Sequence, residues 1–259
     1  MGDEKEDGRE KSGSFPIPGR GWREISPANR YAAPVGDETD PLRKPVGEPS
    51  RSQRYFHAGN DVITDHPWAR GVTFNVAGDY RYLSDGYYAS LEAELRGWHI
   101  HPTTSEALDG YIAPIAAEKA ARGGLAVPES SIVLDTATLP ALVHPVNPFS
   151  HHPELIYSQA EVLTKLGTLT RVGKYVAFCQ HLPESFEIKV LPCIFGRTPD
   201  STFEHLLQRS FDVFKLPLMR VRLIDTDKTT LFSGIEPLPL EQLTSAELAL
   251  VEELGTWQT

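Results

Sequence analysis

The amino-acid sequence predicts an α/β fold, with an α+β arrangement as the alternative: a single domain whose mixed, partly parallel sheet is flanked by helices. The first observation is the stretch 71–102, which has the pattern of strand, polar loop, helix and strand. Such a β-α-β unit usually places its two strands parallel. The second is the stretch 187–256, where strands and helices follow one another with clear boundaries. With 40% hydrophobic residues, a chain of 259 residues can bury a sizeable core.

Residues 1–52 are expected to form a disordered or loosely docked arm, ahead of a folded domain that spans residues 53–259. The arm mixes charges of both signs with seven prolines and has almost no periodic apolar positions. Such a segment cannot bury enough surface to offset the entropy that is lost on ordering. The alternative is a recognition tail anchored by Trp22 and Tyr31.

The domain is expected to begin with a strand at Gly71–Ala77, where β-branched and aromatic residues alternate, and a second strand follows at Trp98–His101. Ser84 or Asp85 can cap the helix between them. This helix is predicted to bury one apolar face, to carry an i,i+4 ion pair and to end at a glycine in the left-handed conformation. The residues concerned are Tyr88, Leu91 and Leu95 for the face, Glu92 and Arg96 for the pair, and Gly97 for the end.

The middle of the chain is expected to consist of short elements. Thr103 and Glu106 have capping-box spacing at the start of a helix, which Pro114 disturbs. Glycines and prolines then break up residues 122–158. The elements predicted beyond this helix are a strand at Ser131–Leu134, a helix at Gln159–Leu166 and a strand at Lys174–Cys179.

The last third has the clearest pattern. Three strands are predicted there, at Glu187–Phe195, Leu218–Ile224 and Thr230–Ile235. Between the first two lies a helix with a wide apolar face, for which Thr198 is the predicted N-cap and Pro199 the first helical residue. A closing helix is expected to begin at Thr244, with Glu247 at the reciprocal capping-box position.

Composition and missing motifs argue against several classes of function. The formal net charge of −10 disfavours a surface that neutralises phosphates, so we expect no nucleic acid partner. The N-terminus is charged where a signal peptide is apolar, and no run of apolar residues in the sequence is long enough to span a membrane. Two cysteines cannot make a disulfide framework. We therefore expect no membrane contact and a cytoplasmic location. The Walker loop, the dinucleotide fingerprint and the nucleophile elbow are absent from the sequence.

A metal site and a catalytic thiol are chemical alternatives, and we expect neither. The side chains that would form the metal site are His144, His151, His152 and Glu154, completed by His57 or His66. Their spacing matches no helix-borne metal motif, and adjacent histidines in an extended chain point apart. Cys179 and Cys193 lie in apolar, strand-like runs, where cysteine usually packs as a small core residue.

The loop Asp79–Gly86 is the best candidate binding site, because free backbone N–H groups at a helix N-terminus can hold an anion. It also follows a strand's C-terminal end, the side on which open α/β sheets bind ligands. Arg81 can clamp a carboxylate or phosphate with two hydrogen bonds. The candidate ligand-binding residues are Asp79, Tyr80, Arg81, Tyr82, Ser84, Asp85, Gly86 and Tyr87, with Arg197 as the cation at the equivalent junction Phe195–Asp200. The structural alternative is that Ser84 and Asp85 cap the helix, Arg81 pairs internally and the tyrosines pack.

The run Asn75–Gly97 resembles the signature of the RimK-like ATP-grasp N-terminal domain family. That signature has an Asn-Leu-Cys-Arg-x-Tyr-x-Tyr core, followed by Gly-Tyr-Tyr-x-Ser-Leu-Leu-Ala-Glu-Ala-Arg-Gly. Two later stretches, Ile194–Thr198 and Phe211–Val221, resemble its second conserved block. The resemblance covers roughly residues 70–250. The chain departs from the pattern at Ala77 and Gly78, where the family tends to have cysteine and arginine.

The resemblance implies an association with ligases that activate a carboxylate as an acyl phosphate and join it to an amine. In this family the domain is usually fused to an ATP-grasp ligase, and we expect this chain, which ends at Thr259, to lack that ligase domain. The hypothesis is a non-catalytic accessory or substrate-recognition domain that presents the 79–86 loop to a small anionic or amino-acid ligand. No cofactor is expected in this chain, and ATP and Mg²⁺ would be held by a separately encoded partner ligase.

Two alternatives from other classes stay open. One is an independent small-molecule enzyme that binds an anionic ligand at the 79–86 loop, using Arg81, Arg197 and either His99 or His101. The other is a degenerate domain that only scaffolds an assembly.

Overall fold

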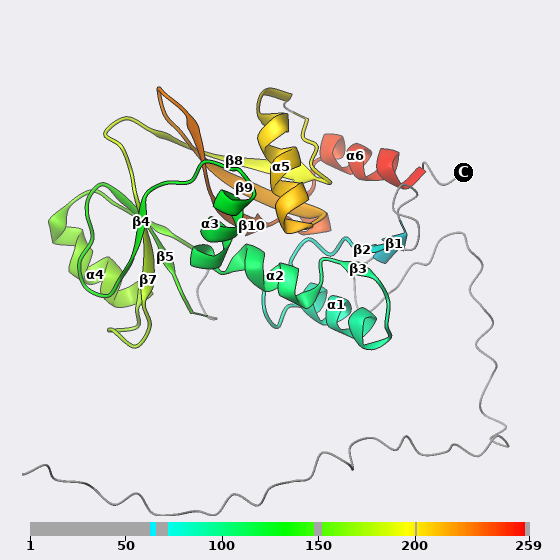
Figure 1. Ribbon diagram of the computed structural model, residues 1–259, viewed down its shortest axis with the longest axis horizontal. Helices are drawn as coiled ribbons and strands as arrows, with labels where there is room; N and C mark the ends of the chain where they lie inside the picture. The colour runs from blue at the N-terminus through cyan, green and yellow to red at the C-terminus, as the bar shows by residue number, and fades with distance from the viewer. Residues whose placement is uncertain (1–62, 66–71, 148–151, 200, 257–259) are drawn as a thin grey trace, which may run out of the picture. The chain divides into compact units, whose positions relative to one another are not determined.

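The computed structural model describes residues 63–65, 72–147, 152–199 and 201–256. All of them belong to one compact unit, Glu48–Thr259, and the predicted arm, residues 1–52, lies outside the described residues. Within the described part, helices pack with three sheets, of which one is mixed and two are antiparallel (Figure 1). The predicted α/β class is therefore confirmed, with the strands divided among three small sheets.

The first sheet has the order β1-β2-β3 and contains the predicted β-α-β unit. β1 (Ile63–Asp65) is antiparallel to β2 (Thr73–Asn75), and β2 is parallel to β3 (Ile100–His101). The helix α1 (Asp85–Leu95) connects β2 to β3. The predicted parallel pair is thus confirmed, and the loop before α1 lies just beyond the end of β2.

The buried face of α1 differs from the predicted one. Tyr88 and Leu95 are 49% and 80% exposed, so the prediction of an apolar face built on them is wrong. The buried residues are Gly86, Tyr87, Ala89, Ser90 and Ala93. Ala89 and Ala93 pack against Ile100 of β3, because small side chains let a helix approach a strand closely.

The ends of α1 follow the sequence prediction. Ser84 is the N-cap, and its hydroxyl accepts a hydrogen bond from the Tyr87 N–H at 3.2 Å. Arg96 forms the expected ion pair with Glu92, and Gly97 has a positive φ of 75° just after the helix.

Two helices, α2 (Thr104–Tyr111) and α3 (Ala113–Arg122), follow β3 and contact β10. The capping box is confirmed: the Thr103 hydroxyl accepts from the Glu106 N–H at 3.1 Å, and the Glu106 carboxylate accepts from the Thr103 N–H at 2.8 Å. Pro114 lies in the first turn of α3, where a proline removes no helical hydrogen bond. The disturbance predicted at Pro114 is therefore a boundary between two helices.

The second sheet is antiparallel throughout and has the order β4-β7-β5-β6. Its strands are β4 (Ser130–Val133), β5 (Ala141–Pro145), β6 (Glu154–Ile156) and β7 (Ala177–His181), and α4 (Gln159–Leu169) packs on them. The predictions for β4, α4 and β7 are confirmed apart from their bounds, whereas β5 and β6 were not predicted. All five residues of β5 are buried, so this strand has no alternating pattern that marks it in the sequence.

The third sheet contains β8 (Glu187–Ile194), β9 (Leu218–Asp225) and β10 (Thr230–Pro237), and it is antiparallel. The three strands themselves were predicted, with slightly different bounds. A 3-10 turn, Ser201–Phe203, precedes α5 (Glu204–Phe214), which buries the expected apolar face. The prediction that Thr198 caps this helix is wrong, because the helix begins too far along the chain for its hydroxyl to reach. That hydroxyl is buried and has no hydrogen-bond partner among the described residues.

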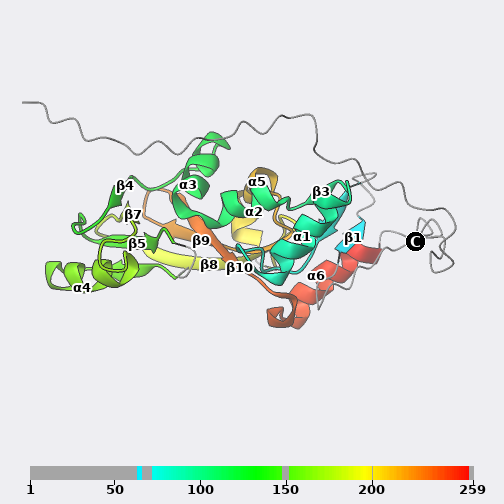
Figure 2. The same cartoon turned by 90° about the horizontal axis from the view of Figure 1, so that it is seen from below.

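The largest core lies between the β8-β9-β10 sheet and the helices α2, α3 and α5, which Figure 2 shows on one side of that sheet. The last helix, α6 (Ser245–Thr256), contacts β8. Its predicted capping box is confirmed, because the Glu247 carboxylate accepts from the Thr244 N–H at 2.7 Å and the Thr244 hydroxyl accepts from the Glu247 N–H at 3.3 Å. Among the described helices, none has the length and apolar character that a membrane crossing needs.

Candidate functional site

Arg81 of the candidate loop pairs with its neighbour Asp79. Its Nε donates to Oδ1 at 2.8 Å and its Nη2 donates to Oδ2 at 2.5 Å. These hydrogen bonds raise the pKa of Arg81 above its ordinary value, so the side chain is a permanent cation. The internal pairing that we gave as the alternative is present, and it fixes the guanidinium in one place.

The tyrosines of the loop have different environments. Tyr80 is fully buried, and its hydroxyl donates to the Asn75 carbonyl at 2.8 Å. Tyr87 is also buried, and the half-exposed Tyr82 packs edge-on against its ring. Tyr80 and Tyr87 are therefore core residues, and Tyr82 is the tyrosine of this loop that solvent and ligands can reach.

Ser84, Asp85 and Gly86 form the start of α1. The Ser84 hydroxyl caps the helix and also donates to the Asp79 carbonyl at 2.8 Å, while Asp85 is exposed in the first turn. A Cβ at Gly86 would lie 2.3 Å from the Asp79 carbonyl oxygen, so only glycine fits there. Ligand binding by these residues stays a prediction, and their structural roles are evident.

Replacing Ser84 by alanine is expected to lower the free energy of unfolding by about 1 kcal/mol, the usual cost of losing a helix N-cap. Urea denaturation followed by circular dichroism measures this change. The matched control is Ser130→Ala, since Ser130 is an exposed serine on β4. Equal stability of the Ser84 variant and the wild type would show that the hydroxyl is not needed for the fold.

Arg197 lies apart from this loop. Its Nη1 donates to the Glu253 carboxylate of α6 at 3.1 Å, and its side chain is partly exposed. The histidines of the enzyme alternative are also placed elsewhere: His101 Nδ1 lies 2.7 Å from the Glu106 carboxylate. Neither Arg197 nor these histidines line the cavity that Arg81 faces.

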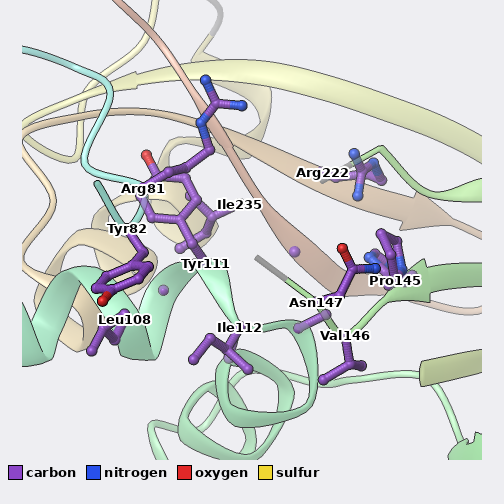
Figure 3. A pocket seen from close by; sticks show the side chains of 15 residues that line it. Arg81, Tyr82, Leu108, Tyr111, Ile112, Pro145, Val146, Asn147, Arg222 and Ile235 are labelled. Atoms are coloured by element: carbon purple, nitrogen blue, oxygen red, sulfur yellow. The ribbon is translucent and has the colours of Figure 1, made fainter. Parts of the chain in front are cut away.

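Arg81 lines a cavity of about 250 Å³. Its walls come from the 81–82 loop, the junction of α2 and α3, the end of β5, and β9 and β10. Figure 3 shows Arg81 beside Tyr82 and Tyr111 on one side, and Arg222 beside Pro145 and Asn147 on the other. The apolar part of the wall is formed by Leu108, Ile112, Ala113, Ala116, Val146 and Ile235. Apolar walls with a few polar groups are typical of small-molecule sites.

The charged side chains among the described residues of this wall are cationic. Arg81 and Arg222 line the cavity, and the described residues that line it include no aspartate or glutamate. Arg222 is only 6% exposed; its Nη2 donates to the Glu236 carboxylate, while its Nη1 and Nε make no hydrogen bond with the residues that the structure describes. Burial lowers the pKa of Arg222, and Glu236 opposes that shift. The cavity therefore offers a buried guanidinium with unused donors.

Two further polar side chains line the cavity. The Tyr111 hydroxyl is buried beside Tyr80, Asp79 and Arg81, and burial raises its pKa well above the ordinary value. His144 is 5% exposed, and its Nε2 lies 3.0 Å from the Gln180 amide oxygen. Burial, followed by the charge of Arg222, lowers the pKa of His144 to about 3, so the imidazole is neutral at pH 7.

The residues of the metal-site and catalytic-thiol alternatives do not form a reactive site in the described part of the chain. His144 lies in β5 rather than in a loop, His152 is exposed, and His57, His66 and His151 lie outside the described residues. No group of three or more metal-binding side chains occurs in the part of the chain that is described. Cys179 and Cys193 are buried, as expected for core residues, and burial raises the pKa of Cys193 to about 12.

Sequence reasoning did not propose Arg222, Tyr111 or a role for His144 in ligand binding. One signal was available for Arg222, because it lies between the apolar residues Val221 and Leu223 of β9, and a cation that is buried there has to find a polar partner. No comparable signal marks His144 or Tyr111, since they join the site only through the tertiary fold.

Residues 61–254 match the family described as the RimK-like ATP-grasp N-terminal domain. The chain belongs to this family. The resemblance that the 75–97 signature indicated is thereby confirmed. No curated protein matches this RimK-like chain.

The fold of this RimK-like domain is similar to solved ATP-grasp structures. D-alanine–D-alanine ligase from Helicobacter pylori has 12% identity and a TM-score of 0.50, over 70% of this chain and 69% of that chain. The ATP-grasp RimK domain protein from Sphaerobacter thermophilus DSM 20745 has 12% identity and a TM-score of 0.49, over 65% and 74% of the two chains. At this identity the first likeness shows the fold alone. That the ligase machinery is held by a separate chain stays a prediction.

Proposed function

We propose that this chain is a non-catalytic substrate-recognition domain for carboxylate–amine ligation by a separately encoded ATP-grasp ligase, and that it binds a small anionic ligand in the cavity. The observation that carries the proposal is the guanidinium of the buried residue Arg222, on a wall whose described residues include no carboxylate. Membership in the RimK-like family supports the association with ligation. ATP and Mg²⁺ belong, in this proposal, to the partner ligase.

The electrostatics favour a carboxylate ligand. Nη1 and Nε of Arg222 donate to no described residue, so a carboxylate in the cavity can accept hydrogen bonds from them. Arg81 adds a second cation to the wall, although Asp79 neutralises much of its charge. Arg222 is paired with Glu236 in the same way, so the cavity attracts a carboxylate through directed N–H donors rather than through a net positive charge.

The donor set of the cavity also supports a binding role without catalysis. Mg²⁺ is usually held by carboxylates together with substrate phosphates, and the described residues that line this cavity supply no carboxylate. Tyr111 has a raised pKa and His144 a lowered one, so neither titrates near pH 7 as a general acid or base would. These groups bind and orient a ligand, and no phosphoryl-transfer step is assigned to them.

Hexanoate is the first ligand to test, because it joins a carboxylate to an apolar chain that suits the cavity wall. Isothermal titration calorimetry is expected to detect its binding to the wild type and an affinity at least tenfold lower for Arg222→Gln. The matched control is Arg220→Gln on the same strand, because Arg220 is bound to the Pro237 carbonyl and to Gln242 and does not line the cavity. Circular dichroism checks that each variant is folded. Equal losses in both variants, or no binding to the wild type, would overturn the ligand site.

The non-catalytic role has a separate test. The chain alone, mixed with ATP, Mg²⁺, a carboxylate and an amine, is expected to release no phosphate and form no amide. Adding the ATP-grasp ligase encoded in the same genome should give amide formation that increases with the amount of this chain. Amide formed by the chain alone would favour an independent enzyme instead.

A further inference from the structure

The tautomer of His144 is fixed by a chain of hydrogen bonds that begins at a backbone carbonyl. The Gln180 Nε2 donates to the Ser233 carbonyl at 2.9 Å, which orients the side-chain amide of Gln180. The Ser233 hydroxyl donates to Gln180 Oε1 at 2.6 Å, and the same oxygen faces His144 Nε2 at 3.0 Å. An amide oxygen only accepts, so His144 Nε2 carries the proton. The unprotonated nitrogen of this neutral ring is then Nδ1, a hydrogen-bond acceptor.

Nδ1 of His144 is available for a ligand. It makes no hydrogen bond with any residue in the described part of the chain, and His144 lines the cavity. The hydrogen bonds that fix this tautomer join three buried residues. Gln180, Ser233 and His144 are each at most 5% exposed, so water does not compete strongly for these hydrogen bonds. His144, a mostly buried residue of the cavity wall, therefore has a ring acceptor to which no described residue donates.

Gly234 lies beside both the His144 ring and Arg222. A Cβ at position 234 would lie 3.6 Å from Arg222 Nη1 and 3.6 Å from Cε1 of His144, the ring carbon between Nδ1 and Nε2. Gly234 also lines the cavity, and the absence of a side chain there leaves space between the guanidinium and the imidazole. A ligand group in this space meets a cationic donor on one side and the edge of a neutral acceptor ring on the other.

We propose that the ligand is a 2-hydroxy carboxylic acid, whose carboxylate accepts hydrogen bonds from Arg222 and whose hydroxyl donates to Nδ1 of His144 above Gly234. This inference rests on the proposed function, since it names the class of ligand for the same cavity. The apolar wall formed by Leu108, Ile112 and Ile235 contacts the rest of the ligand. His144 acts here as a specificity-determining residue, and Gln180 as the residue that positions its proton.

A hydroxyl suits this place better than an ammonium group. Arg222 is close enough to His144 for its charge to lower the pKa of the imidazole. The same positive charge disfavours a ligand ammonium beside the ring, whereas a neutral hydroxyl donates to Nδ1 without that repulsion. The geometry therefore separates 2-hydroxy acids from 2-amino acids of the same size.

Three acids of equal chain length test the inference: hexanoate, 2-hydroxyhexanoate and 2-aminohexanoate. Calorimetry at pH 7.5 with the full chain is expected to give about fivefold to tenfold tighter binding of 2-hydroxyhexanoate than of hexanoate, the value of one added hydrogen bond. The 2-amino acid is expected to bind more weakly than the 2-hydroxy acid. In His144→Phe the hydroxyl advantage should disappear while hexanoate binding remains, because Gln180 Oε1 keeps its bond from Ser233.

Gly234→Ala provides a second variant that removes no polar group. Its methyl occupies the space between Arg222 and His144 at ordinary contact distances, so the fold is expected to be retained and the affinity for 2-hydroxyhexanoate to fall about tenfold. Equal affinities for hexanoate and 2-hydroxyhexanoate in the wild type would overturn this inference and leave the carboxylate site standing. A preference for the 2-amino acid would overturn the hydroxyl assignment. Failure of all three acids to bind would overturn the proposed function itself.

Discussion

Replacing Gly78 by alanine is expected to lower the free energy of unfolding by about 3–5 kcal/mol, because two separate costs add. Gly78 has φ of 77°, in the region where a Cβ is strained. A Cβ there would also lie 1.9 Å from the Leu238 carbonyl oxygen and 2.9 Å from Cα of Pro239. Both contacts are with backbone, so no side chain can rotate away to relieve them.

The clash would act on the junction that places the candidate loop. The Gly78 carbonyl accepts a hydrogen bond from the Leu238 N–H at 2.8 Å, which ties the end of β10 to the residue just before Asp79. Leu238 is itself in the main core, so a shift there disturbs packing as well. The departure from the family signature at Gly78 thus has a structural reason, since an arginine has no room at this position.

Gly97→Ala is the matched control for Gly78→Ala. Gly97 has nearly the same φ, 75°, but apart from its chain neighbours no described residue has an atom within 4 Å of a Cβ placed there. Gly97→Ala is expected to lower the free energy of unfolding by about 1 kcal/mol, because of backbone strain alone. Urea denaturation of the wild type and both variants measures the difference. Equal costs for the two glycines would contradict the close packing of Gly78 against Leu238.

Elements with a local signal were predictable from the sequence. Ser84, Thr103 and Thr244 were expected to begin helices and do so, because a cap acts on N–H groups two or three residues further along the chain. The face of α1 was not predictable in the same way. Which side of that helix is buried depends on β3 and on how closely small residues allow the two to approach.

The candidate site shows the same division between local and long-range information. Arg81 was predicted, since it belongs to a polar loop before a helix. Arg222 and His144 lie on β9 and β5, in two different sheets. The two sheets are joined by the hydrogen bond from Gln180 of β7 to Ser233 of β10 and by the packing of Leu142 against Ile224. No periodicity or spacing in the sequence encodes a contact of this kind.

Stability is expected to fall as the pH decreases from 7 to 5, in part because of His144. The pKa of this imidazole is about 3 in the folded protein, lowered first by burial and then by Arg222, whereas an unfolded chain has an ordinary histidine pKa of about 6.5. Between these two values the unfolded state binds a proton that the folded state does not bind. The contribution of His144 to stability is therefore complete above about pH 6.5 and decreases as the pH falls toward 3.

The expected loss from this residue between pH 7 and pH 5 is about 2 kcal/mol in the free energy of unfolding. His144→Phe has no titrating group at that position, so its stability should fall by about 2 kcal/mol less than that of the wild type over the same range. Urea denaturation at pH 5, 6 and 7 measures both slopes. His205→Phe is the control for the substitution, because His205 is exposed on α5 and water solvates its ring in both states. If the free energy of unfolding changed equally with pH in the wild type and in His144→Phe, the folded protein would accept a proton at His144. The neutral ring nitrogen on which ligand selection depends would then be absent at moderately acidic pH.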